Sequence, residues 1–236
     1  RLSLAVLEGP ALRRAAAVHF TAEDEKREAE QTGIPMNGVV IPLAIDPLPA
    51  ADGKLFRARF PALESARYLL YLSRLDRKKN VEGLLRAFSQ CAAQWPGAIL
   101  VIAGDGAPGY AAGLKALADD LGLKDRVVWA GHVDGDLKAS ALAGAELFVL
   151  PSFSENFGIA AAEALMAGLP CVLAQGVAIA GDVVAAGAGV AVAPEPASIG
   201  AGLQQVLADD AARLAMSAAA MRLAQQKYSA RAMGAN

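Results

Sequence analysis

Short apolar runs alternate with segments of helical period along most of the chain, from Tyr68 onward. The runs occupy residues 68–73, 98–104, 126–131, 147–151, 171–175 and 189–193. Their apolar residues follow one another without alternation, as in strands that are buried on both faces of a parallel sheet. Because a helix-period segment separates each run from the next, the pattern predicts an α/β domain with a doubly wound parallel sheet.

The first 46 residues have a different pattern. They predict a strand over 17–21, a charged helix over 22–33 and a second strand over 38–44. Thr21 and Asp24 have the T-x-x-D spacing of a helix cap. The stretch 1–16 is typical of a helix that begins before Arg1, so we expect the chain to be a piece of a longer protein.

Two further segments flank the predicted sheet domain, which we place at residues 68–197. Residues 47–67 are rich in proline and polar side chains, and we expect them to form a linker. Residues 198–236 are rich in alanine and have a helical period, so we expect them to form C-terminal helices.

Composition excludes several classes of protein. A hydrophobic content of 55% excludes a disordered chain, and a net charge of -2 without a long basic run gives no support for nucleic-acid binding. Cys91 and Cys171 stand in apolar surroundings without zinc-ligand spacing, so we expect buried thiols in a reducing cytoplasm and no metal site. No apolar run reaches the roughly 18 residues of a membrane span, and no stretch has the pattern of a signal peptide, so we expect a cytosolic protein.

Ligands of such sheets bind beyond the carboxyl ends of the strands, so the loops there are the places to look for chemistry. The loop SRLDRKKN, residues 73–80, carries Arg74 and Lys79 with two further cations between them. A solvated charged loop is one interpretation. The alternative is an anion site, because arginine can bind phosphate oxygens in a fork while lysine supplies a point charge.

The loop after the second run contains Gly104, Gly106 and Gly109 in the G-x-G-x-x-G spacing of dinucleotide-binding proteins. Two details disagree with that interpretation. Asp105 would place a negative charge against a pyrophosphate, and the acidic residue expected about 20 positions later is absent. NAD(P) binding therefore remains a minor alternative.

The stretch SENFGIAAAEALMAGLP, residues 154–170, carries two carboxylates eight positions apart. Within one helix, Glu155 and Glu163 would lie roughly 12 Å apart along the axis, which suits no pair of facing catalytic acids. If the helix begins near Gly158 instead, its first N–H groups can bind a phosphate, and Glu163 can accept from a ribose diol. The alternative is a capping box of Ser152 and Glu155, with Glu163 paired to a basic side chain.

These segments, with RVVWAGHV and GVAIAGDVVAAGAGVAV, resemble in order and spacing the C-terminal half of GT-B glycosyltransferases of family 4, the glycosyl transferases group 1. The resemblance is close over residues 68–193 and looser at both ends, and its most specific element is the E-x7-E spacing. It implies a Rossmann-like domain that binds the donor, a nucleoside-diphosphate sugar, without a cofactor or metal. Residues 1–46 would be the remnant of the N-terminal domain, which binds the acceptor.

The resemblance also implies a role for each matching residue. Arg74 and Lys79 would bind the diphosphate, Glu163 the ribose hydroxyls, and Glu155 would lie beside the reacting carbon of a sugar transferred with retention. The remaining donor contacts would come from Asn156, Phe157, Gly158 and Ile159, with His132 and Val133 near the base. Asp134 and Asp136 have the spacing of the metal-binding DxD pair of the other glycosyltransferase fold, but they precede a predicted helix, so we expect a helix cap instead.

Three residues depart from the family pattern: Ser73 and Asn80 stand where glycine is common, and Asp182 where glutamate is usual. The expected partners are a nucleotide sugar, the missing N-terminal domain and an acceptor glycan or lipid of the cell envelope. Any contact with the inner face of the membrane would be made by the missing half. We expect donor binding without transfer by this piece. The alternatives are an epimerase or phosphorylase of the same fold, or a non-catalytic module that binds NAD(P) or a protein.

Overall fold

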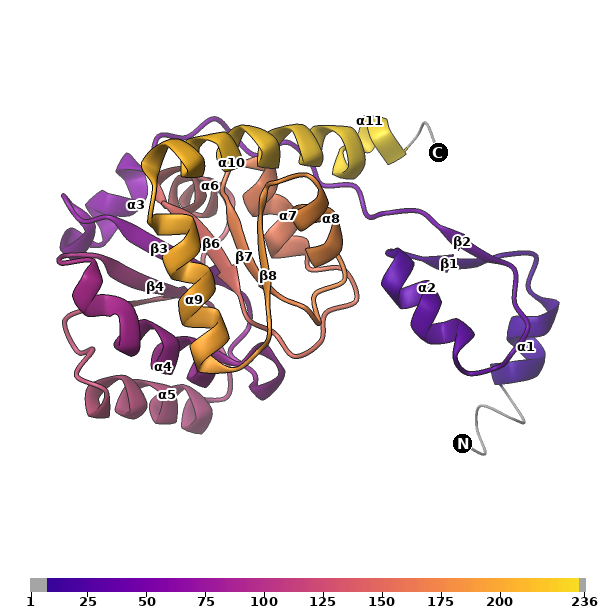
Figure 1. Ribbon diagram of the computed structural model, residues 1–236, viewed down its shortest axis with the longest axis horizontal. Coiled ribbons are helices and arrows are strands. Elements are labelled where there is room, and N and C mark those ends of the chain that lie inside the picture. Colours follow the sequence, from indigo (N-terminus) through magenta and orange to yellow (C-terminus); the bar gives the residue numbers. More distant parts are fainter. Residues whose placement is uncertain (1–7, 234–236) are drawn as a thin grey trace.

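The main body of the protein is a six-stranded parallel sheet in the order β5-β4-β3-β6-β7-β8, seen in the computed structural model, which describes residues 8–233 (Figure 1). The strands are β3 (Tyr68–Leu72), β4 (Ile99–Ala103), β5 (Val127–Gly131), β6 (Leu147–Leu150), β7 (Cys171–Ala174) and β8 (Gly189–Val192). Each strand lies within one of the apolar runs, and β3, β4, β6 and β7 are almost completely buried. The predicted doubly wound α/β fold is confirmed.

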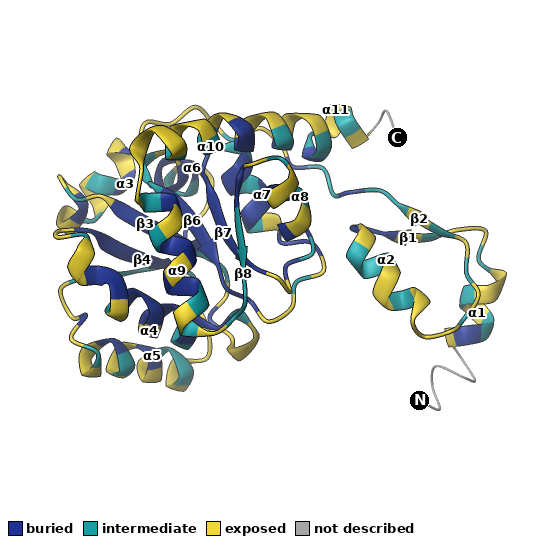
Figure 2. Cartoon of the chain, viewed as in Figure 1, coloured by how far each residue is buried: buried dark blue, intermediate teal, exposed yellow. Residues whose placement is uncertain are grey.

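Helices cover both faces of this sheet. Figure 2 shows the buried strands in the centre and the exposed outer sides of the helices around them. One face carries α4 (Val81–Cys91), α5 (Pro108–Asp120) and α9 (Pro196–Leu207); the other carries α6 (Gly135–Gly144), α7 (Ile159–Met166) and α8 (Ala180–Ala185). Helix α10 (Asp210–Leu223) packs against α7 and α8. A π-helical turn, η5 (Ala224–Tyr228), and α11 (Ala230–Met233) follow. Among residues 8–233 no helix is both long and apolar enough to cross a bilayer.

The turn from β3 into α4 is fixed by the buried side chain of Asn80. Its Oδ1 accepts from the N–H of Gly83 at 3.2 Å, while its Nδ2 donates to the carbonyls of Pro151 at 3.1 Å and Pro194 at 2.8 Å. These bonds join the loops that follow three different strands. Asn80 itself has a left-handed backbone with φ 56°, a conformation that glycine adopts readily and asparagine tolerates.

The segment 47–67 is not the linker that we expected. It contains α3 (Lys54–Arg59) and the 3-10 turn η2 (Pro61–Leu63), and its Phe56 and Leu63 are completely buried. The N–H of Phe56 donates to Ser140 Oγ at 3.0 Å, so α3 is attached to α6. The prediction was wrong because a helix of six residues gives too short a periodic pattern to stand out against the surrounding prolines and polar residues.

The N-terminal unit contains a separate parallel pair of strands, β1 (Val18–Phe20) and β2 (Gly38–Val40). Helix α2 (Glu23–Glu30) connects them along the chain and lies beside the pair (Figure 1). The expected Thr21–Asp24 cap is wrong. Thr21 donates through both its N–H and its Oγ to Glu25 Oε2, each at 2.7 Å, because the helix begins at Glu23 with Ala22 as its N-cap. Of the helix expected over 1–16, α1 (Gly9–Arg14) is seen, and residues 1–7 lie outside the described part.

Both cysteines are buried thiols, as predicted, and we expect them to be unreactive in the native protein. Burial raises the pKa of Cys91 to about 11 and raises that of Cys171 as well. Because their pKa values are raised, both thiols should remain protonated at pH 8. They should therefore be inert, since the thiolate is the nucleophile. Labelling with a disulfide reagent should be slow in buffer and complete in denaturant. Fast native labelling of either thiol would contradict this burial.

Candidate functional site

A cavity of about 810 Å³ opens at the carboxyl edge of the sheet, where β3 and β6 lie side by side and the chain changes direction across the sheet. Ligands of open α/β sheets bind at such a point. Eight of the ten donor-site residues predicted from the sequence line it: Arg74, Lys79, Glu155, Asn156, Phe157, Gly158, Ile159 and Glu163.

The cationic wall of the cavity comes from the loop between β3 and α4. Burial raises the pKa of Tyr71, whose hydroxyl donates to the carbonyl of Arg74 at 2.9 Å and so fixes the loop backbone. The exposed guanidinium of Arg74 has no ion-pair partner among the described residues, which leaves it available to an anion. Lys79, at the end of the 3-10 turn η3 (Arg77–Lys79), is instead paired with Glu155.

Glu155 lies in the loop before α7, as predicted, and not within that helix. Its Oε1 accepts from Lys79 Nζ and, at 3.0 Å, from Ser152 Oγ. Its N–H donates to the carbonyl of Gly176 at 2.9 Å, which attaches the loop to the one that follows β7. Because α7 begins only at Ile159, Ser152 and Glu155 do not form a capping box for this helix.

The first turn of α7 faces the cavity with unused backbone donors. Gly158 precedes the helix with φ 92°, and a Cβ there would lie 2.9 Å from a methyl group of Val177. Both the conformation and the space therefore require glycine. The N–H groups of Phe157, Gly158 and Ile159 have no partner within the described part of the chain. Together with the helix dipole, they form a site suited to an anion.

Glu163 lies in the second turn of α7, among buried alanines and leucines. Its Oε1 accepts from Lys138 Nζ at 2.7 Å, and the side chains of Lys138 and Glu163 are only 24% and 16% exposed. Lys138 comes from the N-terminal end of α6 and was missed in the sequence. Its position just after β5, on the ligand side of the sheet, is the signal that could have identified it.

The N-terminal unit also reaches this cavity. Glu25 Oε1 accepts from Asn156 Nδ2 at 3.2 Å, and Thr21 Oγ, whose proton is shared with Glu25, lies 3.3 Å from the carbonyl oxygen of Asn156. Both residues line the cavity, and sequence reasoning assigned neither of them to the site. The α2 end of the N-terminal unit thus holds the loop that carries Glu155.

His132 and Val133 are not brought into this cavity. Val133 is buried, while the His132 side chain is 72% exposed and lies 3.7 Å from Asp134 Oδ2. Asp134 occupies the N-cap of α6, although its side chain makes no capping hydrogen bond. Within residues 8–233, no group of three or more histidine, cysteine or acidic side chains is arranged to hold a metal ion.

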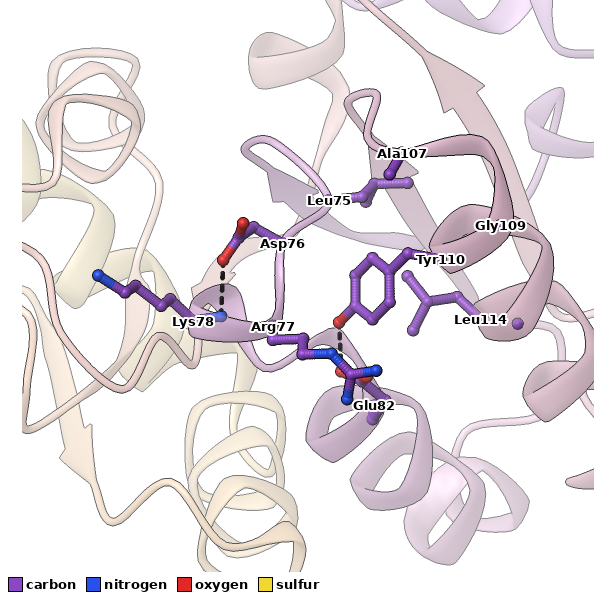
Figure 3. A pocket seen from close by; sticks show the side chains of 10 residues that line it. Leu75, Asp76, Arg77, Lys78, Glu82, Ala107, Gly109, Tyr110 and Leu114 are labelled. Atoms are coloured by element: carbon purple, nitrogen blue, oxygen red, sulfur yellow. Dashed lines mark hydrogen bonds between the residues drawn. The ribbon is translucent and has the colours of Figure 1, made fainter.

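A second cavity, of about 790 Å³, lies on the other side of the loop after β3, between it and α5 (Figure 3). Tyr110 donates to Glu82 Oε2 at 2.6 Å, and the guanidinium of Arg77 lies over the ring of Tyr110. Figure 3 shows the ammonium of Lys78 pointing away from these groups. Lys78 and Asp76 line both cavities, so the loop separates two neighbouring spaces.

The three glycines that suggested NAD(P) binding have different roles here. A Cβ on Gly104 would lie 1.9 Å from the carbonyl oxygen of Ser73, and one on Gly106 would lie 2.2 Å from that of Leu75. Both glycines thus allow the loop after β4 to pack against the loop after β3. A Cβ on Gly109 would contact nothing within 4 Å. Packing between two loops therefore accounts for the first two glycines without a bound nucleotide.

Comparison with known proteins places this geometry among sugar transferases. The family described as "Glycosyl transferases group 1" matches residues 54–223. Alpha-monoglucosyldiacylglycerol synthase of Streptococcus pneumoniae is 32% identical over 123 residues, which are 52% of this chain. D-inositol 3-phosphate glycosyltransferase of Mycobacterium tuberculosis is 32% identical over 133 residues, or 55% of the chain. Each match covers 27% of the relative's own length.

Solved structures show the same fold. The Anabaena protein HepE, crystallised in complex with UDP and glucose, aligns with 99% of this chain and 65% of its own at a TM-score of 0.86 and 22% identity. At that identity the likeness shows the fold alone.

Proposed function

Because this chain belongs to the glycosyl transferases group 1 family, we propose that its main domain binds the nucleoside-diphosphate sugar donor of a retaining glycosyltransferase. The observation that carries the proposal is the cavity at the β3–β6 junction. Among the described residues, the unpaired Arg74, the ion-paired Lys79 and the free N–H groups at the start of α7 meet there, and Glu155 and Glu163 line the same cavity. Relatives that act on sugars and a structural neighbour crystallised with UDP and glucose support this assignment.

The diphosphate would lie between the loop after β3 and the first turn of α7. Arg74 and Lys79 supply positive charge from one side, and the N–H groups of Phe157, Gly158 and Ile159 supply donors from the other. The same groups can stabilise the charge that develops on the departing nucleoside diphosphate. On this proposal the protein itself neutralises the leaving group, without a metal.

The carboxylates of Glu163 and Glu155 would bind the two sugar units of the donor. Glu163, which lines the cavity from α7, would accept hydrogen bonds from the ribose hydroxyls. Glu155, in the preceding loop, is assigned to the transferred sugar, where it orients hydroxyls and stabilises positive charge at the reacting carbon. Asn156, held by Thr21 and Glu25, would fix the loop between them.

Transfer to an acceptor is proposed for the whole protein, acting with an acceptor-binding domain. From the described N-terminal unit, Thr21, Glu25 of α2 and Leu43 line the donor cavity. We therefore expect the 236 residues to bind donor without transferring its sugar. A cell-envelope glycan or lipid is the proposed acceptor, at the cytoplasmic face of the membrane.

Calorimetric titration of the chain with UDP, GDP, ADP and NAD, first without metal and then with magnesium, tests the proposal. One nucleoside diphosphate should bind without metal, and Glu163→Gln should weaken it. Glu64→Gln is the control, because Glu64 is exposed and precedes β3, at the opposite edge of the sheet. Preference for NAD would favour the alternative of a dinucleotide-binding module. Binding of none of the four would overturn the donor site.

A further inference from the structure

The two carboxylates of the proposed donor site are held in the same way. Glu155 uses its Oε1 for Lys79, and Glu163 uses its Oε1 for Lys138. In both residues the second oxygen, Oε2, has no hydrogen bond to any residue that the structure describes. All four side chains line the same cavity, and none is more than 24% exposed. Each lysine thus fixes one carboxylate oxygen and leaves the other without a hydrogen-bond partner among the described residues.

The two lysines come from different elements. Lys79 ends the loop after β3, while Lys138 lies near the start of α6, where its N–H donates to the carbonyl of Asp134. A cation close to a helix N-terminus is unfavourable to the helix dipole, so the stability of α6 gives no reason for Lys138. The reason lies in Glu163, a carboxylate on an otherwise apolar helix that needs a compensating partner.

We propose that Lys138 is a positioning residue for the ribose subsite, an inference that rests on the proposed donor binding. By holding Oε1 of Glu163, it directs Oε2 toward the ribose hydroxyls. It also offsets the charge of a carboxylate that would otherwise repel the nearby diphosphate. Lys138 thus holds Glu163 in the ribose subsite in the same way that Lys79 holds Glu155 in the sugar subsite.

This role makes a specific demand on the ligand. Because Lys138 acts through Glu163, its removal should matter chiefly when the ligand presents a ribose diol to that carboxylate. If Lys138 instead contacted the phosphates directly, its removal would lower the affinity for every nucleotide to the same extent. A structural role in α6 would lower stability without changing the preference between ligands.

The experiment compares two ligands: the nucleoside diphosphate that the chain binds most tightly and the 2′,3′-dideoxy form of the same compound. Lys138→Met should weaken the natural nucleotide about tenfold, as expected for loss of one hydrogen bond between charged groups, and should change the affinity for the dideoxy compound little. In a Glu163→Gln background, Lys138→Met should have almost no further effect. Lys138→Arg, which keeps the charge and the donor, should restore most of the preference.

Lys124→Met is the matched control, because Lys124 is exposed, precedes β5 and has no ion pair with another described residue. Equal weakening of both ligands by Lys138→Met, or no weakening of either, would overturn the role of Lys138 alone. If the unsubstituted chain bound no nucleoside diphosphate, the donor site itself would be overturned, and this inference with it.

Discussion

Replacing Lys79 with alanine should lower the affinity of the chain for a nucleoside diphosphate about a hundredfold. Two effects add. The diphosphate loses a charge-assisted hydrogen bond, and Glu155, which is only 15% exposed, loses its cation. Among the described residues, the carboxylate then keeps Ser152 as its one side-chain partner and faces the phosphates without a cation. Repulsion between these negative charges makes the loss larger than removal of one contact.

Arg74→Ala is the comparison that separates the two effects. Arg74 has no carboxylate partner among the described residues, so its loss leaves no acid unpaired, and we expect a reduction of about tenfold. Adding Glu155→Gln to Lys79→Ala should recover part of the affinity, because the repelling charge is gone. Calorimetric titration of these three variants and of the unsubstituted chain measures the lost contact and the added repulsion separately. Unchanged binding in Lys79→Ala would contradict the proposed diphosphate site.

Gly104→Ala should destabilise the protein by about 4 kcal/mol or more, among the largest effects of a single substitution. The new Cβ would lie 1.9 Å from the carbonyl oxygen of Ser73, and Gly104 has φ 142°, where other residues are strained. Relief requires the loops after β3 and β4 to separate. Since domains are stable by only about 5–15 kcal/mol, much of the native stability would be lost.

Gly113→Ala is the matched control for this substitution. Gly113 lies in the interior of α5, and a Cβ there would contact nothing within 4 Å. Alanine should therefore stabilise the helix by about 0.5–1 kcal/mol. Urea denaturation of both variants checks the two signs. Equal midpoints for Gly104→Ala and the unsubstituted chain would show that the two loops do not pack as described.

The positions of the strands along the chain could be predicted from the sequence, because a strand that is buried on both faces is a run of consecutive apolar residues. Strand β4 consists of five consecutive apolar residues, and every one of them is buried. The start of α7 was equally readable, since a glycine followed by an apolar helical segment marks it. From that start, the location of Glu155 outside the helix and of Glu163 inside it followed directly.

Short or unusual elements could not be read in this way. Helix α3 has six residues, and its burial depends on α6, which lies about 80 positions later in the chain. The Thr21–Asp24 cap was wrong for a related reason. Several acidic residues stand near Thr21, and the helix start at Glu23 decides that Glu25 reaches it.

By itself, the sequence determined the α/β class, the strands and the loop positions of most candidate ligand-binding residues, because each depends on the polarity of neighbours along the chain. Only the tertiary structure decided which charges meet. Lys79 lies 76 positions from Glu155, and Lys138 lies 25 positions from Glu163. Residues so far apart in the sequence meet only because the parallel strands bring their carboxyl ends to one edge of the sheet. The ion pairs therefore depend on strand order and on loop packing. The same alignment gave Gly104 its role against Ser73, which its spacing within a nucleotide-binding pattern could not reveal.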